Sequence, residues 1–194
     1  SIDVASLGVQ VHGGMGFIEE TGAAQYYRDA RILPIYEGTT AIQANDLIGR
    51  KTVRDGGKVA KSLLAGIAGT VEALGSQQGA AFDSMKTYLA QGHRSLSAVV
   101  DFVVANTKGD PNAVFAGSVP YLKLAGIVLG GWQMARALLV AAQKRDEDPS
   151  FYGAKIATAQ FYAEHVLPLA SALEASIVNA KGGEGVLALS EDQF

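Results

Sequence analysis

A single carboxylate, Glu37, lies in a short segment whose neighbours suit proton transfer. It follows the apolar pair Ile35 and Tyr36 and precedes Gly38, just before a new helical pattern begins. Apolar neighbours desolvate a carboxylate, which favours its neutral form and suits a general base. The first backbone N–H groups of a helix have no partner within the helix and can bind a developing oxyanion. The segment therefore predicts a base and an oxyanion donor close together.

A structural role competes with this chemical one. Acidic residues are common near the start of a helix because they interact favourably with the helix dipole. On spacing alone, the simpler interpretation is that Glu37 caps a helix that begins at Thr39 or Thr40.

A second candidate segment is Gln10–Gly16, where Gly13, Gly14 and Gly16 follow a helical pattern. Glycine-rich turns let a backbone approach phosphate groups closely. A dinucleotide fingerprint needs a strand before its glycines, and here a helix precedes them, so a Rossmann site is excluded. A glycine pair that ends a helix explains the segment in isolation.

The other titratable side chains give no catalytic pattern. The charges of Arg28, Asp29 and Arg31 alternate along one predicted helix, which is typical of a structural ion-pair network. The three histidines have no metal-ligand spacing and the chain has no cysteine, so no metal site is expected.

Composition indicates a compact protein. The chain is 48% hydrophobic and 18% charged, which favours a folded body over disorder. Its net charge of −3 argues against a nucleic-acid partner. The lack of cysteine fits a reducing compartment such as the cytoplasm. The chain begins at Ser1 without the basic and apolar pattern of a signal peptide, and we expect it to be part of a longer protein.

Helical periodicity runs along the whole chain, and no segment keeps the alternation of a strand. This predicts an all-α fold. In residues 1–55 the pattern predicts helices over about 2–11, 23–33 and 40–54 and a loop over 13–21, with Pro34 ending the second helix.

Residues 56–181 have a different hydrophobic pattern. Four long amphipathic patterns with short links predict an antiparallel four-helix bundle. The most apolar of them, over 124–142, contains Arg136, which is costly inside a bilayer, so we expect a buried bundle helix rather than a membrane span. Pro168 is expected to kink the fourth helix. Residues 182–194 are expected to form a poorly ordered tail.

Three motifs, in this order and spacing, resemble the acyl-CoA dehydrogenase family. They are Gln10 with the glycines at 13, 14 and 16, RDARI at 28–32, and IYEGTTAIQ at 35–43. The match covers about residues 2–51, and it corresponds to the end of the family's C-terminal helical domain. The part from about Gly56 onward looks like the extra C-terminal helical domain of long bacterial members.

The resemblance implies a flavin-dependent enzyme. It oxidises the Cα–Cβ bond of an acyl-CoA thioester to a trans-2-enoyl-CoA and passes electrons to electron-transfer flavoprotein. Glu37 corresponds to the base that removes the α-proton while the β-hydrogen leaves as hydride to the flavin. The N–H of Glu37 corresponds to a donor to the thioester carbonyl, and Tyr36 and Gly38 correspond to residues that line the thioester.

Other positions correspond to FAD contacts. The loop of Gln10, Val11, His12, Gly13 and Gly14 corresponds to the one that binds the FAD diphosphate and ribose of a neighbouring subunit. Thr39 corresponds to a contact with the adenylate end. Two positions depart from the pattern: His12 replaces a usually apolar residue, and Ala41 stands where many members have a Gln that reaches the flavin nucleotide.

The resemblance further implies a homo-oligomer in the bacterial cytoplasm, with FAD, acyl-CoA and electron-transfer flavoprotein as its partners. The family's N-terminal helical domain and its β-domain do not occur in this sequence, so the chain alone is expected to be inactive. The alternative is a stand-alone helical module that oligomerises through its bundle.

Overall fold

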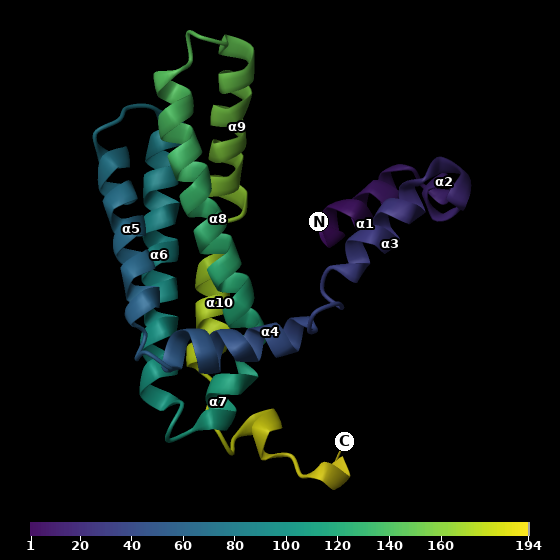
Figure 1. The fold of residues 1–194 in the computed structure, drawn as a ribbon, viewed down its shortest axis with the longest axis vertical. Helices are drawn as coiled ribbons and strands as arrows, with labels where there is room; N and C mark the ends of the chain where they lie inside the picture. The colour runs from purple at the N-terminus through teal and green to yellow at the C-terminus, as the bar shows by residue number, and fades with distance from the viewer. Residues whose placement is uncertain (194) are drawn as a thin grey trace. The chain divides into compact units, whose positions relative to one another are not determined.

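The computed structural model describes residues 1–193 and contains helices and turns but no strand within them (Figure 1). The predicted all-α class is confirmed. The chain divides into two compact units: an N-terminal unit, Ser1–Gln43, and a C-terminal unit that begins at Ala44. The domain division predicted at residue 55 stays a prediction.

The N-terminal unit is a hairpin of two helices. Helices α1 (Ile2–Val11) and α3 (Ala23–Ile32) agree with the helices predicted there, and they contact each other. The predicted loop between them is wrong in part, because it contains α2 (Gly14–Phe17) and a 3-10 turn, Glu19–Thr21. Gly13, with a φ of 62°, adopts a left-handed conformation that favours glycine and turns the chain between α1 and α2.

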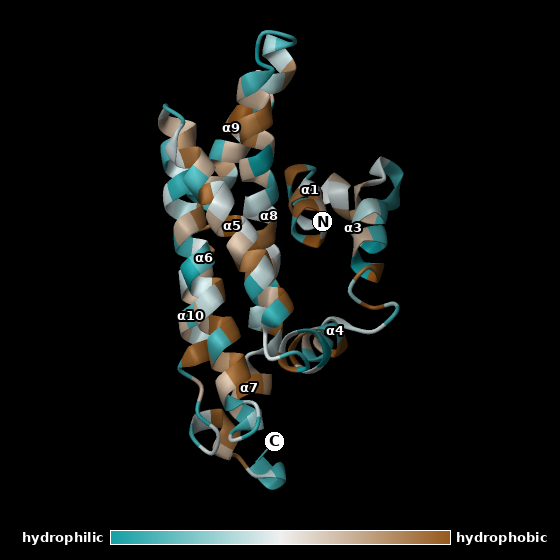
Figure 2. Cartoon of the chain, turned by 60° about the vertical axis from the view of Figure 1, so that its left-hand side comes forward, coloured by the Kyte–Doolittle hydropathy of each residue, from teal (hydrophilic) through white to brown (hydrophobic). Residues whose placement is uncertain are grey.

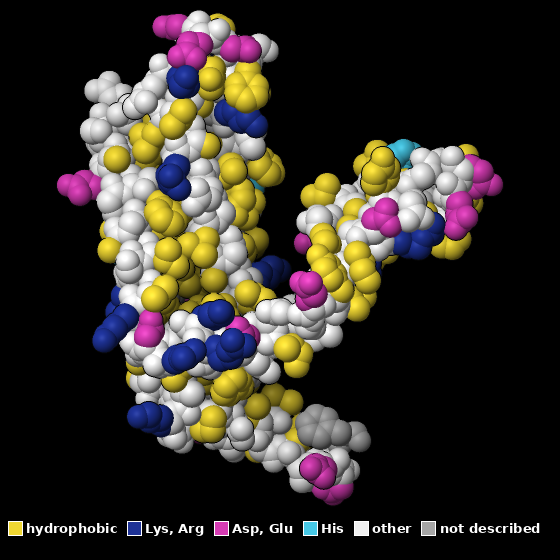
Figure 3. All heavy atoms as spheres, in the orientation of Figure 1, with side chains coloured by type: hydrophobic (Ala, Val, Ile, Leu, Met, Phe, Trp, Pro, Cys, Tyr) yellow, Lys and Arg dark blue, Asp and Glu magenta, His cyan; other side chains and the backbone are white. Residues whose placement is uncertain are grey.

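The N-terminal unit buries almost no large side chain. Its buried residues are Gly16, Ala23 and Ala24, and α1 has none. Val11 is 85% exposed and Phe17 is 82% exposed. Hydrophobic colouring covers much of α1 in Figure 2, and hydrophobic side chains lie on the surface of this unit in Figure 3. Among the described residues, burial of apolar surface therefore contributes little to the stability of the N-terminal unit.

Helix α4 (Thr40–Asp46) continues directly into a π-helical segment, η2 (Leu47–Val53). The predicted helix is thus continuous, but its turns widen. The Thr52 hydroxyl donates to the Leu47 carbonyl, five residues earlier, at 2.8 Å. It also lies 2.9 Å from the Tyr121 hydroxyl, which must be the donor because Thr52 has one proton to give. This pair fixes the wide turn, and burial raises the pKa of Tyr121.

The C-terminal unit is built from helices packed side by side (Figure 1). Helix α6 contacts α5, α8, α9 and α10, and so lies in the middle of this packing. The core contains Ile67, Met85, Leu124 and Ile177, all fully buried. The helices are α5 (Lys58–Gly75), α6 (Ala80–Asn106), α7 (Pro111–Ala116), α8 (Ser118–Gln143), α9 (Pro149–His165) and α10 (Leu169–Val178).

The long helices agree with the predicted patterns except at the end of the chain. The first three patterns correspond to α5, α6 and α8. The fourth consists of two helices, α9 and α10, so the kink predicted at Pro168 is a full interruption. Pro168 has no N–H for a helical hydrogen bond, which explains the break. Leu167, within the break, is buried in the core.

A carboxylate joins α7 to the end of the chain. Asp110 caps α7 by accepting a hydrogen bond from the Ala113 N–H at 3.1 Å. Its other oxygen accepts from the Gly182 N–H at 2.7 Å. The segment predicted as a poorly ordered tail is thus attached where it begins, and it contains 3-10 turns at Gly185–Ala188 and Glu191–Gln193.

Helix α8 is long and apolar enough to cross a membrane by length and composition. Its Tyr121, Leu124, Val128 and Leu138 are buried against neighbouring helices. Core helices of bundles pass the same test, and this packing agrees with the buried helix predicted there.

Two glycines of α8 are expected to respond oppositely to alanine. A β-carbon at Gly131 would lie 2.6 Å from Cδ2 of the buried Leu167, whereas one at Gly126 would meet nothing within 4 Å. Gly131→Ala should therefore lower the free energy of unfolding by about 1–3 kcal/mol through overpacking. Gly126→Ala should raise it by up to about 1 kcal/mol through helix propensity.

Urea unfolding followed by circular dichroism measures both changes. Gly126→Ala is the matched control, since it makes the same substitution in the same helix. Equal effects of the two variants would contradict the close packing of α8 against Leu167.

Candidate active site

The turn between α3 and α4 carries Glu37. The Ile32 carbonyl accepts from the Tyr36 N–H at 3.2 Å as α3 ends. The Pro34 carbonyl accepts from the Thr40 N–H, also at 3.2 Å, as α4 begins. These two bonds enclose Glu37 in a tight connection, which is where the motif predicts it.

The backbone of this turn is unusual at Glu37. Its φ is 53°, and it is the one non-glycine residue with a positive φ among residues 1–193. The next residue, Gly38, has a φ of 101°. A left-handed conformation costs an L-residue about 1–2 kcal/mol, and such strain concentrates at functional sites. A residue that only caps a helix does not require this conformation, so the capping interpretation does not account for it.

The side chains around Glu37 differ from the expectation. Ile35 is 51% exposed, Tyr36 is 52% exposed and Glu37 itself is exposed. The desolvation predicted from these apolar neighbours is therefore not provided by this chain alone. Within the described residues, the N–H groups of Glu37, Gly38 and Thr39 make no backbone hydrogen bond, so the Glu37 N–H can donate to a ligand.

The glycine loop predicted to contact FAD lies at the junction of α1 and α2. Residues 10–14 are all exposed. His12 Nδ1 lies 2.9 Å from the Gly8 carbonyl, which anchors its ring on the end of α1. β-Carbons built at Gly13 and Gly14 would meet nothing within 4 Å. Open backbone of this kind fits the close approach of a diphosphate.

The two predicted groups are not brought together. The loop at 10–14 precedes α3, and the Glu37 turn follows it (Figure 1). The ten residues of α3 span about 15 Å. Thr39 and Ala41, in contrast, adjoin Glu37 at the start of α4. The N-terminal unit therefore presents two separate surfaces.

The structural ion-pair network predicted for Arg28, Asp29 and Arg31 is confirmed only at Arg28. Arg28 pairs with Glu19 at 3.3 Å, while Asp29 accepts from the Gln25 amide at 2.6 Å. Among residues 1–193, no ion pair includes Asp29 or Arg31. Exposed pairs of this kind add little stability, so the Arg28 contact mainly orients α3 against the preceding turn.

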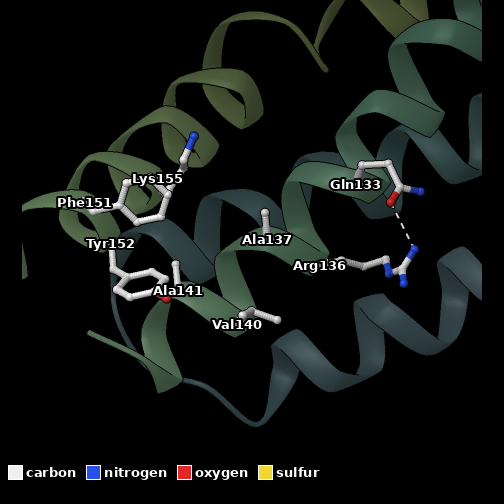
Figure 4. A pocket seen from close by; sticks show the side chains of 8 residues that line it. All are labelled: Gln133, Arg136, Ala137, Val140, Ala141, Phe151, Tyr152 and Lys155. Carbon is white, nitrogen blue, oxygen red and sulfur yellow. Dashed lines mark hydrogen bonds between the residues drawn. The ribbon is translucent and has the colours of Figure 1, made fainter. Parts of the chain in front are cut away.

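Two hollows of the described chain, one in each unit, do not contain Glu37. One of about 180 Å³ lies between α1 and α3 and includes His12 and Tyr26. Another, of about 450 Å³, lies between α8 and α9, with Phe151 and Tyr152 on one helix and Arg136 on the other (Figure 4). Neither hollow supplies walls for a substrate at Glu37.

Gln43 is a site residue that motif reasoning missed. Its Nε2 donates to the Glu37 carbonyl at 2.7 Å. The one available signal was a Gln six residues after the candidate base, early in the next helix. Sequence spacing alone does not tell whether such a side chain reaches back or points to solvent.

Two family matches cover most of the chain. Residues 1–51 match "Acyl-CoA dehydrogenase, C-terminal domain". Residues 63–189 match "Acetyl-CoA dehydrogenase C-terminal like". The order of the two matches agrees with the resemblance seen in the motifs and extends it through the bundle.

Relatives with assigned names agree with these matches. A 3-methylmercaptopropionyl-CoA dehydrogenase of Ruegeria pomeroyi is 50% identical over 192 residues, which is 98% of this chain and 32% of that protein. A broad-specificity linear acyl-CoA dehydrogenase of Mycobacterium tuberculosis is 35% identical over 175 residues, 83% of this chain and 28% of that protein. A subunit of the caffeyl-CoA reductase–Etf complex of Acetobacterium woodii is 44% identical over 41 residues, 21% of this chain and 11% of that protein.

This chain spans about a third of the length of the first two relatives. The motifs of the N-terminal unit, the helical fold and the two family matches agree along the described chain. The chain belongs to the acyl-CoA dehydrogenase family.

Proposed function

We propose that this chain is the carboxyl-terminal part of a flavin-dependent acyl-CoA dehydrogenase and supplies its catalytic base, Glu37. The observation that carries the proposal is the strained turn, with a φ of 53° at Glu37, inside the segment that matches the family's C-terminal domain. Two relatives are named for acting on acyl-CoA thioesters, which supports that substrate class.

The proposed chemistry uses two groups of one residue. The ionised Glu37 carboxylate accepts the α-proton of the thioester. The Glu37 N–H, which has no backbone partner within the described residues, donates to the thioester carbonyl. That hydrogen bond stabilises the negative charge that develops on the carbonyl oxygen as the proton leaves. Since both groups belong to Glu37, one turn positions the base and the donor together, and Tyr36 and Gly38 line the thioester on either side.

FAD, when bound, supplies the acceptor for the β-hydrogen as hydride. Thr39 would contact the flavin nucleotide of the site that contains Glu37, with Ala41 nearby at the start of α4. The loop at 10–14 would contact the FAD diphosphate of a neighbouring subunit. The length of α3, which separates the loop from Glu37, supports this division between subunits and with it a homo-oligomer.

The remaining partners follow from the same proposal. Reduced flavin must be reoxidised, and we assign that role to electron-transfer flavoprotein; the relative from an Etf complex supports this partner. The enzyme is proposed to work in the bacterial cytoplasm.

The complete protein that contains this chain provides the test. It is expected to purify with bound flavin and to lose flavin absorbance under anaerobic conditions when acyl-CoA thioesters of several chain lengths are added. The chain alone is expected to hold no flavin, because Glu37 is exposed and neither of the two described hollows contains it. A complete protein without flavin, or with flavin that no acyl-CoA reduces, would disprove the proposal.

A further inference from the structure

The left-handed conformation of Glu37 needs support from the surrounding structure. An L-residue with a φ of 53° is strained, and such a conformation persists when neighbouring contacts impose it. Glu37 is exposed, so burial does not hold it. Hydrogen bonds within the turn can supply that support.

Gln43 makes the contact that reaches Glu37 itself. Its side-chain Nε2 donates to the Glu37 carbonyl at 2.7 Å, across six residues. The carbonyl can only accept, so the amide is oriented by this bond. The backbone of Gln43 is fixed in turn, because its N–H donates to the Thr39 carbonyl at 3.0 Å in the first turn of α4. Helix α4 therefore holds the donor in place.

Gly38 leaves the space that this contact requires. A β-carbon at Gly38 would lie 3.0 Å from Gln43 Nε2 and 3.4 Å from Cγ2 of Ile42. Its φ of 101° is also unfavourable for other residues. The residue after Glu37 is thus free of a side chain on the side from which the Gln43 amide approaches.

The direction of the bond separates this role from ordinary helix capping. A side chain that caps the start of a helix accepts hydrogen bonds from its free N–H groups. Gln43 does the opposite: it donates to a carbonyl that precedes the helix. Its partner is the backbone of Glu37 rather than the end of α4.

We propose that Gln43 is a positioning residue for Glu37. Its amide fixes the Glu37 carbonyl, and so fixes the peptide geometry that directs both the carboxylate and the N–H of Glu37. It does not touch the substrate in this role. The inference rests on the proposed function of Glu37 as the base.

The test replaces Gln43 by Met, whose side chain has a similar length but no N–H group to donate. In the complete enzyme, Gln43→Met is expected to lower kcat by about 10- to 100-fold, since a base displaced by about 1 Å loses activity on that scale. Flavin content and the KM for acyl-CoA are expected to stay within about twofold of wild type, because Gln43 holds the base and not the ligands.

Gln25→Met is the matched control. Gln25 is also on a helix of the N-terminal unit and also donates its amide, to Asp29 at 2.6 Å, but it does not contact the turn. It is expected to leave kcat unchanged. In the 194-residue chain, the NMR cross-peak between the amide and α protons of Glu37, which a positive φ strengthens, is expected to weaken in Gln43→Met and not in Gln25→Met.

The outcomes distinguish this inference from the proposal on which it rests. An unchanged kcat in Gln43→Met, with Glu37→Gln inactive, would overturn the positioning role and leave the base in place. Loss of flavin and of acyl-CoA binding in Gln43→Met would also overturn it, by showing a general structural defect. An active Glu37→Gln would refute the base itself, while a weakened Glu37 cross-peak in Gln43→Met would still show that Gln43 holds the turn.

Discussion

Replacing Glu37 with Gln in the complete enzyme is expected to lower kcat by about 10²- to 10⁴-fold. The amide keeps the size of the side chain and the backbone N–H but cannot accept the α-proton. FAD content and acyl-CoA affinity are expected to stay near wild type, because the contacts that hold these ligands are unchanged. Stopped-flow measurement of flavin reduction gives the rate, and the spectral change on adding acyl-CoA gives the affinity.

Glu20→Gln is the control for this experiment, since Glu20 is also an exposed carboxylate of the N-terminal unit and loses the same charge. It is expected to have wild-type turnover. A second measurement isolates the proton transfer: wild-type enzyme is expected to exchange the α-proton of a bound thioester with D₂O, and Glu37→Gln is not. Normal turnover in Glu37→Gln would place the base on another residue.

Hydrogen exchange is expected to differ by roughly 1,000-fold or more between the two units of the isolated chain. Amides of α6 and α8 should exchange slowly, because their opening exposes a core that includes Leu124 and Met85, both fully buried. Amides of α1 and α3 should exchange quickly. These helices are hydrogen-bonded, but their unit buries only Gly16, Ala23 and Ala24, and short helices without tertiary burial are marginal in water.

Mass-spectrometric or NMR-detected exchange measures this difference helix by helix. Leu124→Ala sharpens the comparison, since removal of a fully buried Leu costs about 2–5 kcal/mol. It should speed exchange in α6 and α8 and leave α1 and α3 unchanged. If the amides of α1 and α3 exchanged as slowly as those of α8 in the wild-type chain, the N-terminal unit would have a stabilising core of its own, and this prediction would be wrong.

The elements of this fold could be predicted because their signals are local. The apolar spacing of residues 2–11 gives α1 with its observed bounds. Pro168 marks the place where the fourth pattern divides into α9 and α10. The π-helical turns of η2 had no such signal. They depend on two hydrogen bonds of the Thr52 hydroxyl, one with the Leu47 carbonyl and one with the Tyr121 hydroxyl. The second joins residues that are 69 positions apart in the sequence.

The site was predictable by residue type and not by geometry. The order of the motifs identified Glu37, but no propensity favours a φ of 53° for a glutamate. The bond from Gln43 was equally hidden, because it depends on where the turn places a backbone oxygen. The exposure of the side chains next to Glu37 was also predicted wrongly. Ile35 and Tyr36 are apolar, as buried residues usually are, but nothing among the described residues buries them.

The contact between Asp110 and Gly182 has a consequence for the order of folding. Its two partners are 72 residues apart, so an unfolded chain must close a long loop to form it. The loop contains α7, α8, α9 and α10, whose packing brings its ends together. The hydrogen bond should therefore form late in folding, after the helices have packed together, and attach the end of the chain to them. A β-carbon at Gly182 would collide with the Asp110 carboxylate. A substitution at Gly182 should therefore break this hydrogen bond and leave the packed helices intact.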